Sequence, residues 1–234
     1  DLVGGYCRRM LQEGTGCFNT IDDDGHRVEP LPGFVSSLDT FVAALKPFLD
    51  TRPAKAAHAE TLKELNSERT AFKSDAAAFK TAIREQEAIW KTQNTTNGAL
   101  KKAVERLSPI AENSRDLVKQ ADLLYKLACR LIEICENECD ARSSDAWSNR
   151  DITRARKAAD EARQTAVEQL KQVRYFHRQA HWLTERFPEA RLRDVEGLVK
   201  LADRTMIAAN DWSLTPGRYV GVAPEEEDED LDFE

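Results

Sequence analysis

The sequence predicts an all-α protein: an elongated bundle of long antiparallel helices, followed by an extended, acidic carboxy-terminal tail. Charged residues make up 32% of the chain and aromatic residues 7%, which is typical of long amphipathic helices with thin apolar stripes. Apolar residues recur at gaps of three and four over three long segments. Only short runs of turn-forming residues separate these segments, so consecutive helices are expected to run antiparallel.

The first expected elements lie in residues 1–33, which we assign to the end of an upstream element plus a loop. Residues 1–13 can form a short helix, and residues 14–33 form a loop because they are rich in glycine and proline. Because the chain opens with Asp1 rather than Met, we expect a processed form or a piece of a larger protein. Residues 34–209 are the predicted helical bundle domain, and its first helix covers residues 34–49.

The first long helix is predicted over residues 54–93, between the first-turn proline Pro53 and the turn formers of residues 94–98. Its apolar positions follow the a/d seam of a coiled coil through four heptads, with Arg69 and Gln86 as polar interruptions. The seam consists of Leu62, Leu65, Arg69, Phe72, Ala76, Phe79, Ile83, Gln86 and Trp90.

Two further long helices and a short one complete the predicted bundle. Residues 99–141 form the second long helix, which Pro109 is expected to kink or divide. The third covers residues 150–187 and ends at Pro188, and a short helix covers residues 193–209. Residues 210–234 have no helical period, so they are predicted to be an extended docking segment and an acidic tail.

The charge of the chain is concentrated at its end. The net charge is −7, but the last ten residues hold eight acids, and without them 34 basic residues face 33 acidic ones. A balanced body of this kind lacks the basic footprint of an autonomous nucleic-acid-binding protein. No apolar run approaches the ~20 residues that span a bilayer, so no membrane association is expected. Five cysteines are an odd, sparse set, which favours reduced thiols and a cytoplasmic location.

The motifs of common cofactor sites fail on inspection. With Gly25 at position six of a calcium loop, position twelve is Leu31 instead of the required Glu, so an Asp-Gly turn is preferred. Residues 14–16, Gly-Thr-Gly, lack the third glycine and the preceding strand of a dinucleotide loop. The sequence therefore predicts no catalytic, cofactor-binding or metal-binding residue in this chain.

Two clusters leave alternatives open. His177 and His181 have the i, i+4 spacing of a shared metal, as do Cys135 and Cys139, but packing in or beside the core is the preferred interpretation. Basic residues on the third long helix can track phosphates, although a solvated face balanced by acids is preferred because the body is neutral. They are Arg150, Arg154, Lys157, Lys171, Arg174 and Arg178.

One stretch resembles a known family. Residues 210–224, NDWSLTPGRYVGVAP, followed by the acidic run, are similar to the carboxy-terminal signature of the modification (methyltransferase) subunit of type I restriction–modification systems. The resemblance implies that the helical part is the carboxy-terminal module of such a subunit. The residues that we expect to dock are Trp212, Leu214, Pro216, Gly217, Arg218 and Tyr219.

The resemblance also implies an activity for the parent protein and a partner for this chain. The full-length subunit methylates the N6 of adenine in DNA with S-adenosylmethionine. The catalytic Asn-Pro-Pro-Tyr/Phe motif is missing here, since no two prolines are adjacent, so this chain alone is not expected to be an enzyme. In the family, two modification subunits flank one specificity subunit and pack on its long helices. The expected partner is therefore that subunit, and DNA is reached only through the complete complex.

Two other functions remain as hypotheses. A free-standing coiled-coil scaffold would explain the helical stripes alone. A helical metal or redox protein would use His177, His181 and the cysteines.

Overall fold

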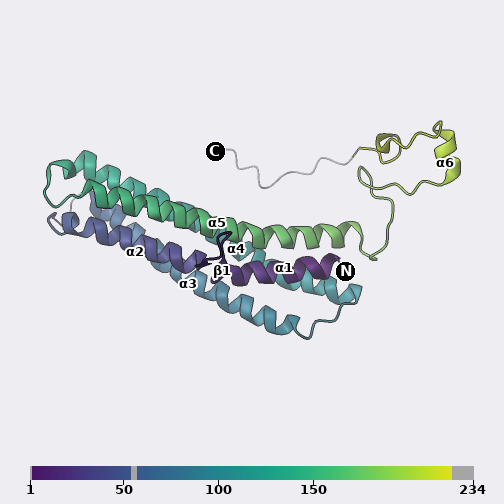
Figure 1. The fold of residues 1–234 in the computed structure, drawn as a ribbon, viewed down its shortest axis with the longest axis horizontal. Coiled ribbons are helices and arrows are strands. Elements are labelled where there is room, and N and C mark those ends of the chain that lie inside the picture. The colour runs from purple at the N-terminus through teal and green to yellow at the C-terminus, as the bar shows by residue number, and fades with distance from the viewer. Residues whose placement is uncertain (1, 54–56, 223–234) are drawn as a thin grey trace. The chain divides into compact units, whose positions relative to one another are not determined.

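The computed structural model describes residues 2–53 and 57–222, and most of these residues are helical (Figure 1). Contacts divide the chain into two compact units, Asp1–His181 and Trp182–Glu234. The first helix packs within the first unit. In chain order the elements are α1 (Leu2–Gly16), β1 (Thr20–Ile21), β2 (Arg27–Val28), α2 (Pro30–Leu49), α3 (His58–Trp90), α4 (Asn97–Glu138), α5 (Asn149–Arg186) and α6 (Arg204–Ala209).

The three long helices expected from the apolar spacing are present as α3, α4 and α5. α3 covers His58–Trp90 of the predicted 54–93, of which residues 54–56 lie outside the described residues. α4 begins two residues before the predicted start and ends three residues before the predicted end. The expected division at Pro109 is wrong, because α4 continues through this proline as one element. In the part of the chain that the structure describes, no helix combines the length and the apolar character needed to cross a membrane.

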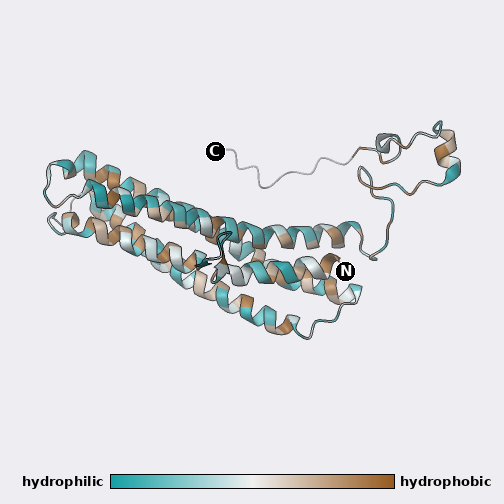
Figure 2. Cartoon of the chain, in the orientation of Figure 1, coloured by the Kyte–Doolittle hydropathy of each residue, from teal (hydrophilic) through white to brown (hydrophobic). Residues whose placement is uncertain are grey.

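The core of the first unit is built from the predicted seams. α3 packs along α4, and α1 packs on both of these helices. Leu65, Phe72, Phe79 and Ile83 of α3 are buried, and so are the seam residues of α4. On α4, Leu127 is buried as well, whereas Leu123 is 40% exposed. Figure 2 shows hydrophilic and hydrophobic positions interspersed along the helices, as amphipathic helices require.

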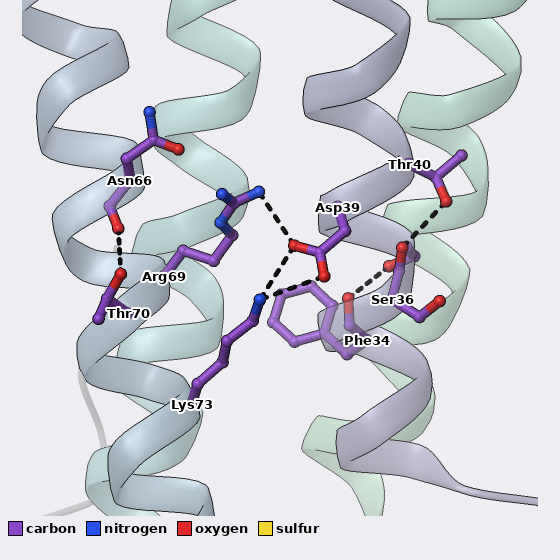
Figure 3. Close-up of polar contacts among 9 residues, drawn as sticks. Phe34, Ser36, Asp39, Thr40, Asn66, Arg69, Thr70 and Lys73 are labelled. Atoms are coloured by element: carbon purple, nitrogen blue, oxygen red, sulfur yellow. Dashed lines mark hydrogen bonds and ion pairs between the residues drawn. The ribbon is translucent and has the colours of Figure 1, made fainter.

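The two polar interruptions of the α3 seam each have a partner on a neighbouring helix. Arg69 lies 3.0 Å from the carboxylate of Asp39 on α2, which Lys73 also contacts at 3.1 Å (Figure 3). Gln86 accepts a hydrogen bond of 2.7 Å from Nε of Arg106 on α4. The seam is therefore satisfied at its polar positions by interhelical bonds, not by solvent alone.

Between α1 and α2 the expected loop of residues 14–33 is shorter and more ordered than predicted. α1 continues to Gly16, β1 and β2 form a small antiparallel hairpin, and α2 begins at Pro30. The carboxylate of Asp22 accepts hydrogen bonds from the backbone N–H groups of Asp24 and His26. Gly25 adopts a φ of +85°, which glycine accommodates without strain. The predicted Asp-Gly turn is present, and the N–H of Gly25 donates to the carbonyl of Asp22 at 3.0 Å.

In the second unit, the predicted helix over residues 193–209 is wrong for most of its length, since only α6 is helical. Asp194 accepts a hydrogen bond from the backbone N–H of Leu201 at 2.9 Å and also contacts Lys200. Such side-chain bonds compete with helix formation. Residues 195 and 199 form an isolated antiparallel bridge instead, and Asp203 caps α6 by accepting from the N–H of Met206 at 2.8 Å.

Candidate docking segment

The candidate site is the segment of residues 210–222, which we call the docking segment. It begins where α6 ends, and the backbone N–H of Trp212 donates to the carbonyl of Ile207 at 2.9 Å. Asp211 and Trp212 both have positive φ angles, 55° and 57°. This conformation is uncommon for a bulky residue. The end of α6 thus determines where the Trp212 side chain projects.

Hydrogen bonds within the segment hold its remaining turns. The hydroxyl of Tyr219 donates to the carbonyl of Ser213. A 3₁₀ turn covers Pro216–Arg218, and the N–H of Tyr219 donates to the carbonyl of Pro216 at 2.9 Å. The predicted extended conformation is therefore replaced by consecutive turns, because Pro216 favours a turn and the Tyr219 hydroxyl closes it.

The docking segment is also tied to the loop that precedes α6. The N–H of Gly197 donates to the carbonyl of Val220 at 2.6 Å. Nη1 of Arg218 makes a longer bond, 3.4 Å, to the carbonyl of Asn210. The first bond joins the segment to the loop before α6, and the second joins two residues of the segment itself, so the segment has a defined shape within the second unit.

Most of the residues predicted to dock are exposed. Trp212 is 62% exposed and Leu214 is 76% exposed, whereas Tyr219 is half-buried against its own turn. Pro216, Gly217 and Arg218 are exposed as well. Burying a large apolar side chain contributes roughly 1.5–3 kcal/mol, so Trp212 and Leu214 offer a partner a sizeable gain. This surface therefore offers a partner two large apolar side chains, Trp212 and Leu214, beside the guanidinium of Arg218.

Reasoning from spacing missed further apolar residues of the second unit. Leu192 is 71% exposed, and Leu198 and Leu201 are about half exposed. Leu198 and Leu201 lie in the part of residues 193–209 that was predicted to be helical and is not, so their exposure was not expected. The signal that finds them is Asp194, whose side chain favours a turn at this point of the sequence.

The rings of His177 and His181 lie 6.1 Å apart, but the first is buried and the second is exposed. The His177 ring is buried, and its Nε2 donates to the carbonyl of Val104 at 3.0 Å. Burial lowers the pKa of His177, and the neighbouring His181 lowers it further, although the bond to Val104 acts in the opposite direction. Among residues 2–53 and 57–222, no group of three or more His, Cys, Asp or Glu side chains is placed to hold a metal ion. The burial of His177 and its bond to Val104 place it in the core of the first unit.

The cysteines are unpaired thiols. Cys7, Cys17, Cys135 and Cys139 are buried, and Cys129 is partly exposed. Burial raises the pKa of Cys7 to about 11 and that of Cys135 to about 12. Because the thiolate is the nucleophile, these side chains are poorly suited to covalent chemistry. Their packing is that of small apolar residues.

No protein-family model matches the chain, and neither does a curated protein or a solved structure. The resemblance of residues 210–224 and the physical character of the docking segment thus carry the functional argument.

Proposed function

We propose that this chain is the carboxy-terminal helical assembly module of a type I restriction–modification methyltransferase subunit, and that it associates with the specificity subunit. The observation that carries the proposal is the docking segment. Trp212 and Leu214, which lie in the stretch resembling the family, are 62% and 76% exposed, in a segment whose turns are held by internal hydrogen bonds. A preformed, exposed apolar surface suits a partner because little ordering is needed on binding.

The helical part supports the same proposal in a different way. Arg106 on α4 bonds Gln86 on α3, and Gln120 on α4 bonds Asp75 further from the connecting turn. Such pairs, whose sequence separation widens away from the turn, are typical of a long antiparallel hairpin, and we include this hairpin in the proposal. It provides a rigid support for the assembly.

The apolar stripes of the long helices suggested that the partner would contact these helices, but the structure favours a different surface. The seam residues of α3 and α4 are largely buried inside the first unit, so they are not available to partner helices. The large apolar side chains of the second unit are exposed instead, with Leu192, Trp212, Leu214 and Val222 all above 60%. We therefore assign the main contact to the docking segment.

The remaining parts of the proposal follow from the family. The full-length subunit would be cytoplasmic, would bind S-adenosylmethionine and would methylate adenine in DNA, whereas this chain supplies no catalytic residue. A free-standing scaffold remains the alternative, and the self-contained core of the first unit favours it.

Co-purification with the specificity subunit tests the proposal. The variant Trp212→Ala/Leu214→Ala should lose the specificity subunit while its melting temperature stays unchanged, because both side chains are exposed. The control Leu2→Ala/Ile21→Ala removes two apolar side chains, each 70% exposed, from the first unit, and should retain the partner.

A second variant tests the shape of the segment. Tyr219→Phe removes only the hydroxyl that bonds Ser213, so it should weaken association less than the double alanine variant. If the double alanine variant still co-purifies with the specificity subunit at the parent level, the docking proposal is wrong.

A further inference from the structure

The outward face of α5 carries a positive charge that the rest of the first unit lacks. Between residues 149 and 181 the sequence has eight Lys or Arg and four Asp or Glu residues, a net charge of +4. In the rest of residues 1–181, 20 basic residues face 23 acidic ones. The neutrality of the whole body therefore conceals a local separation of charge along one helix.

The structure turns this charge toward solvent. The apolar side of α5, including Ile152, Leu170 and Val173, is buried in the core of the first unit. The opposite side presents two sets of exposed basic residues. We call Arg150, Arg154 and Lys157 the first basic group, and Lys171 and Arg178 the second basic group.

The exposed carboxylates of α5 neutralise these groups only in part. Lys157 lies 3.7 Å from Glu161, but both side chains are mostly exposed, and such surface pairs contribute little. Arg150, Arg154 and Lys171 form no ion pair with any residue in the described part of the chain. Tyr175, which is 50% exposed, lies between the two members of the second basic group.

The spacing of the two groups matches a repeat of duplex DNA. Their centres, near Arg154 and Tyr175, are 21 residues apart. At 1.5 Å per residue this separation is roughly 31 Å, close to the ~34 Å of one turn of B-DNA. Glu161 and Glu168 lie between the two groups. An extended acidic peptide has no repeat of this length, so the spacing favours a duplex.

We propose that this face of α5 binds the phosphate backbone of duplex DNA, with the two basic groups contacting phosphates about one helical turn apart. Lysine and arginine contacts to phosphates position a protein on DNA without reading its sequence. The face would thus give this chain a direct, sequence-independent contact with DNA. It lies in the first unit and needs neither the docking segment nor the specificity subunit.

Fluorescence anisotropy with the full chain tests this inference. The probe is a labelled duplex of mixed sequence and about 30 bp, roughly three helical turns. Five phosphate contacts predict a slope near −4.5 for the logarithm of affinity against the logarithm of salt concentration, between about 50 and 200 mM salt. The variant Arg150→Gln/Arg154→Gln/Lys157→Gln should bind at least about 10-fold more weakly and lower the magnitude of that slope by about 3.

A matched control separates the face from net charge. The variant Lys63→Gln/Arg84→Gln/Lys102→Gln removes three exposed basic residues from α3 and α4 and should keep the parent slope. Circular dichroism should show equal helix content in all variants. An equal loss of affinity in the control, or no binding by the parent at about 50 mM salt, would refute the inference. So would polyglutamate that displaces the duplex as effectively, charge for charge, as unlabelled DNA.

Discussion

Replacing Phe72 by alanine probes the contact between α2 and α3 most directly. The side chain is fully buried and meets the ring of Phe34 on α2 edge-on, with centroids 5.5 Å apart and an interplanar angle of 87°. A buried Phe→Ala change costs about 3–5 kcal/mol, since apolar contact is lost and a cavity remains. For a protein of this size each kcal/mol lowers the melting temperature by about 2–4 °C, so we expect a fall of roughly 6–20 °C.

Urea unfolding followed by the helical circular dichroism signal gives the free energy of unfolding for each variant. Phe72→Leu keeps most of the apolar volume and should lose less than Phe72→Ala. A double-mutant cycle with Phe34→Leu should return a coupling of about 0.5–1.5 kcal/mol for the ring pair. A loss below about 1 kcal/mol in Phe72→Ala would mean that this core is not packed as described.

Three other predictions concern the buried polar groups and the cofactor. Burial lowers the pKa of His177 in the folded state, so its contribution to stability is complete above the unfolded pKa of about 6.5. As the pH falls below that value, the free energy of unfolding should decrease by at most about 1.4 kcal/mol per pH unit. Urea titrations at several pH values should show a smaller decrease with pH in His177→Gln than in the parent. Cys129 should react with a thiol reagent before the other four cysteines, which are buried, and mass spectrometry of partly labelled protein would reveal a different order. Calorimetry with S-adenosylmethionine should detect no binding to this chain, and a micromolar dissociation constant would point to a site not recognised here.

Much of the fold could be predicted because the core residues repeat at helical spacing. Phe72 and Ile83 were placed in the seam from spacing alone, and both are buried. The partners of Arg69 and Gln86 could not be predicted in the same way, since Asp39 and Arg106 lie on other helices. Periodicity shows which face of a helix is buried, but it does not show which helix covers that face.

The errors have local causes. Residues 193–203 carry apolar residues at helical spacing, yet the Asp194 side chain binds the backbone and favours a turn. In the candidate site, Trp212 was recognised because it belongs to no helical stripe. The positive φ angle of Trp212 could not be predicted, because bulky residues adopt this conformation rarely.

The bond between Gln86 and Arg106 bears on how α3 is aligned along α4. If α3 slid by one heptad in the direction that brings Phe79 to the position of Gln86, the Arg106 guanidinium would face an apolar ring and lose an acceptor. Gln93 also accepts a hydrogen bond of 2.8 Å from Nη2 of Arg106, so the shift removes one of two acceptors. A hydrogen bond lost by a charged group costs about 1.5–3 kcal/mol. A uniformly apolar seam would tolerate the shift far better, because every heptad offers the same surface. The polar interruption at Gln86, which weakens the coiled-coil pattern in the sequence, thus favours one alignment of α3 along α4 over its neighbours.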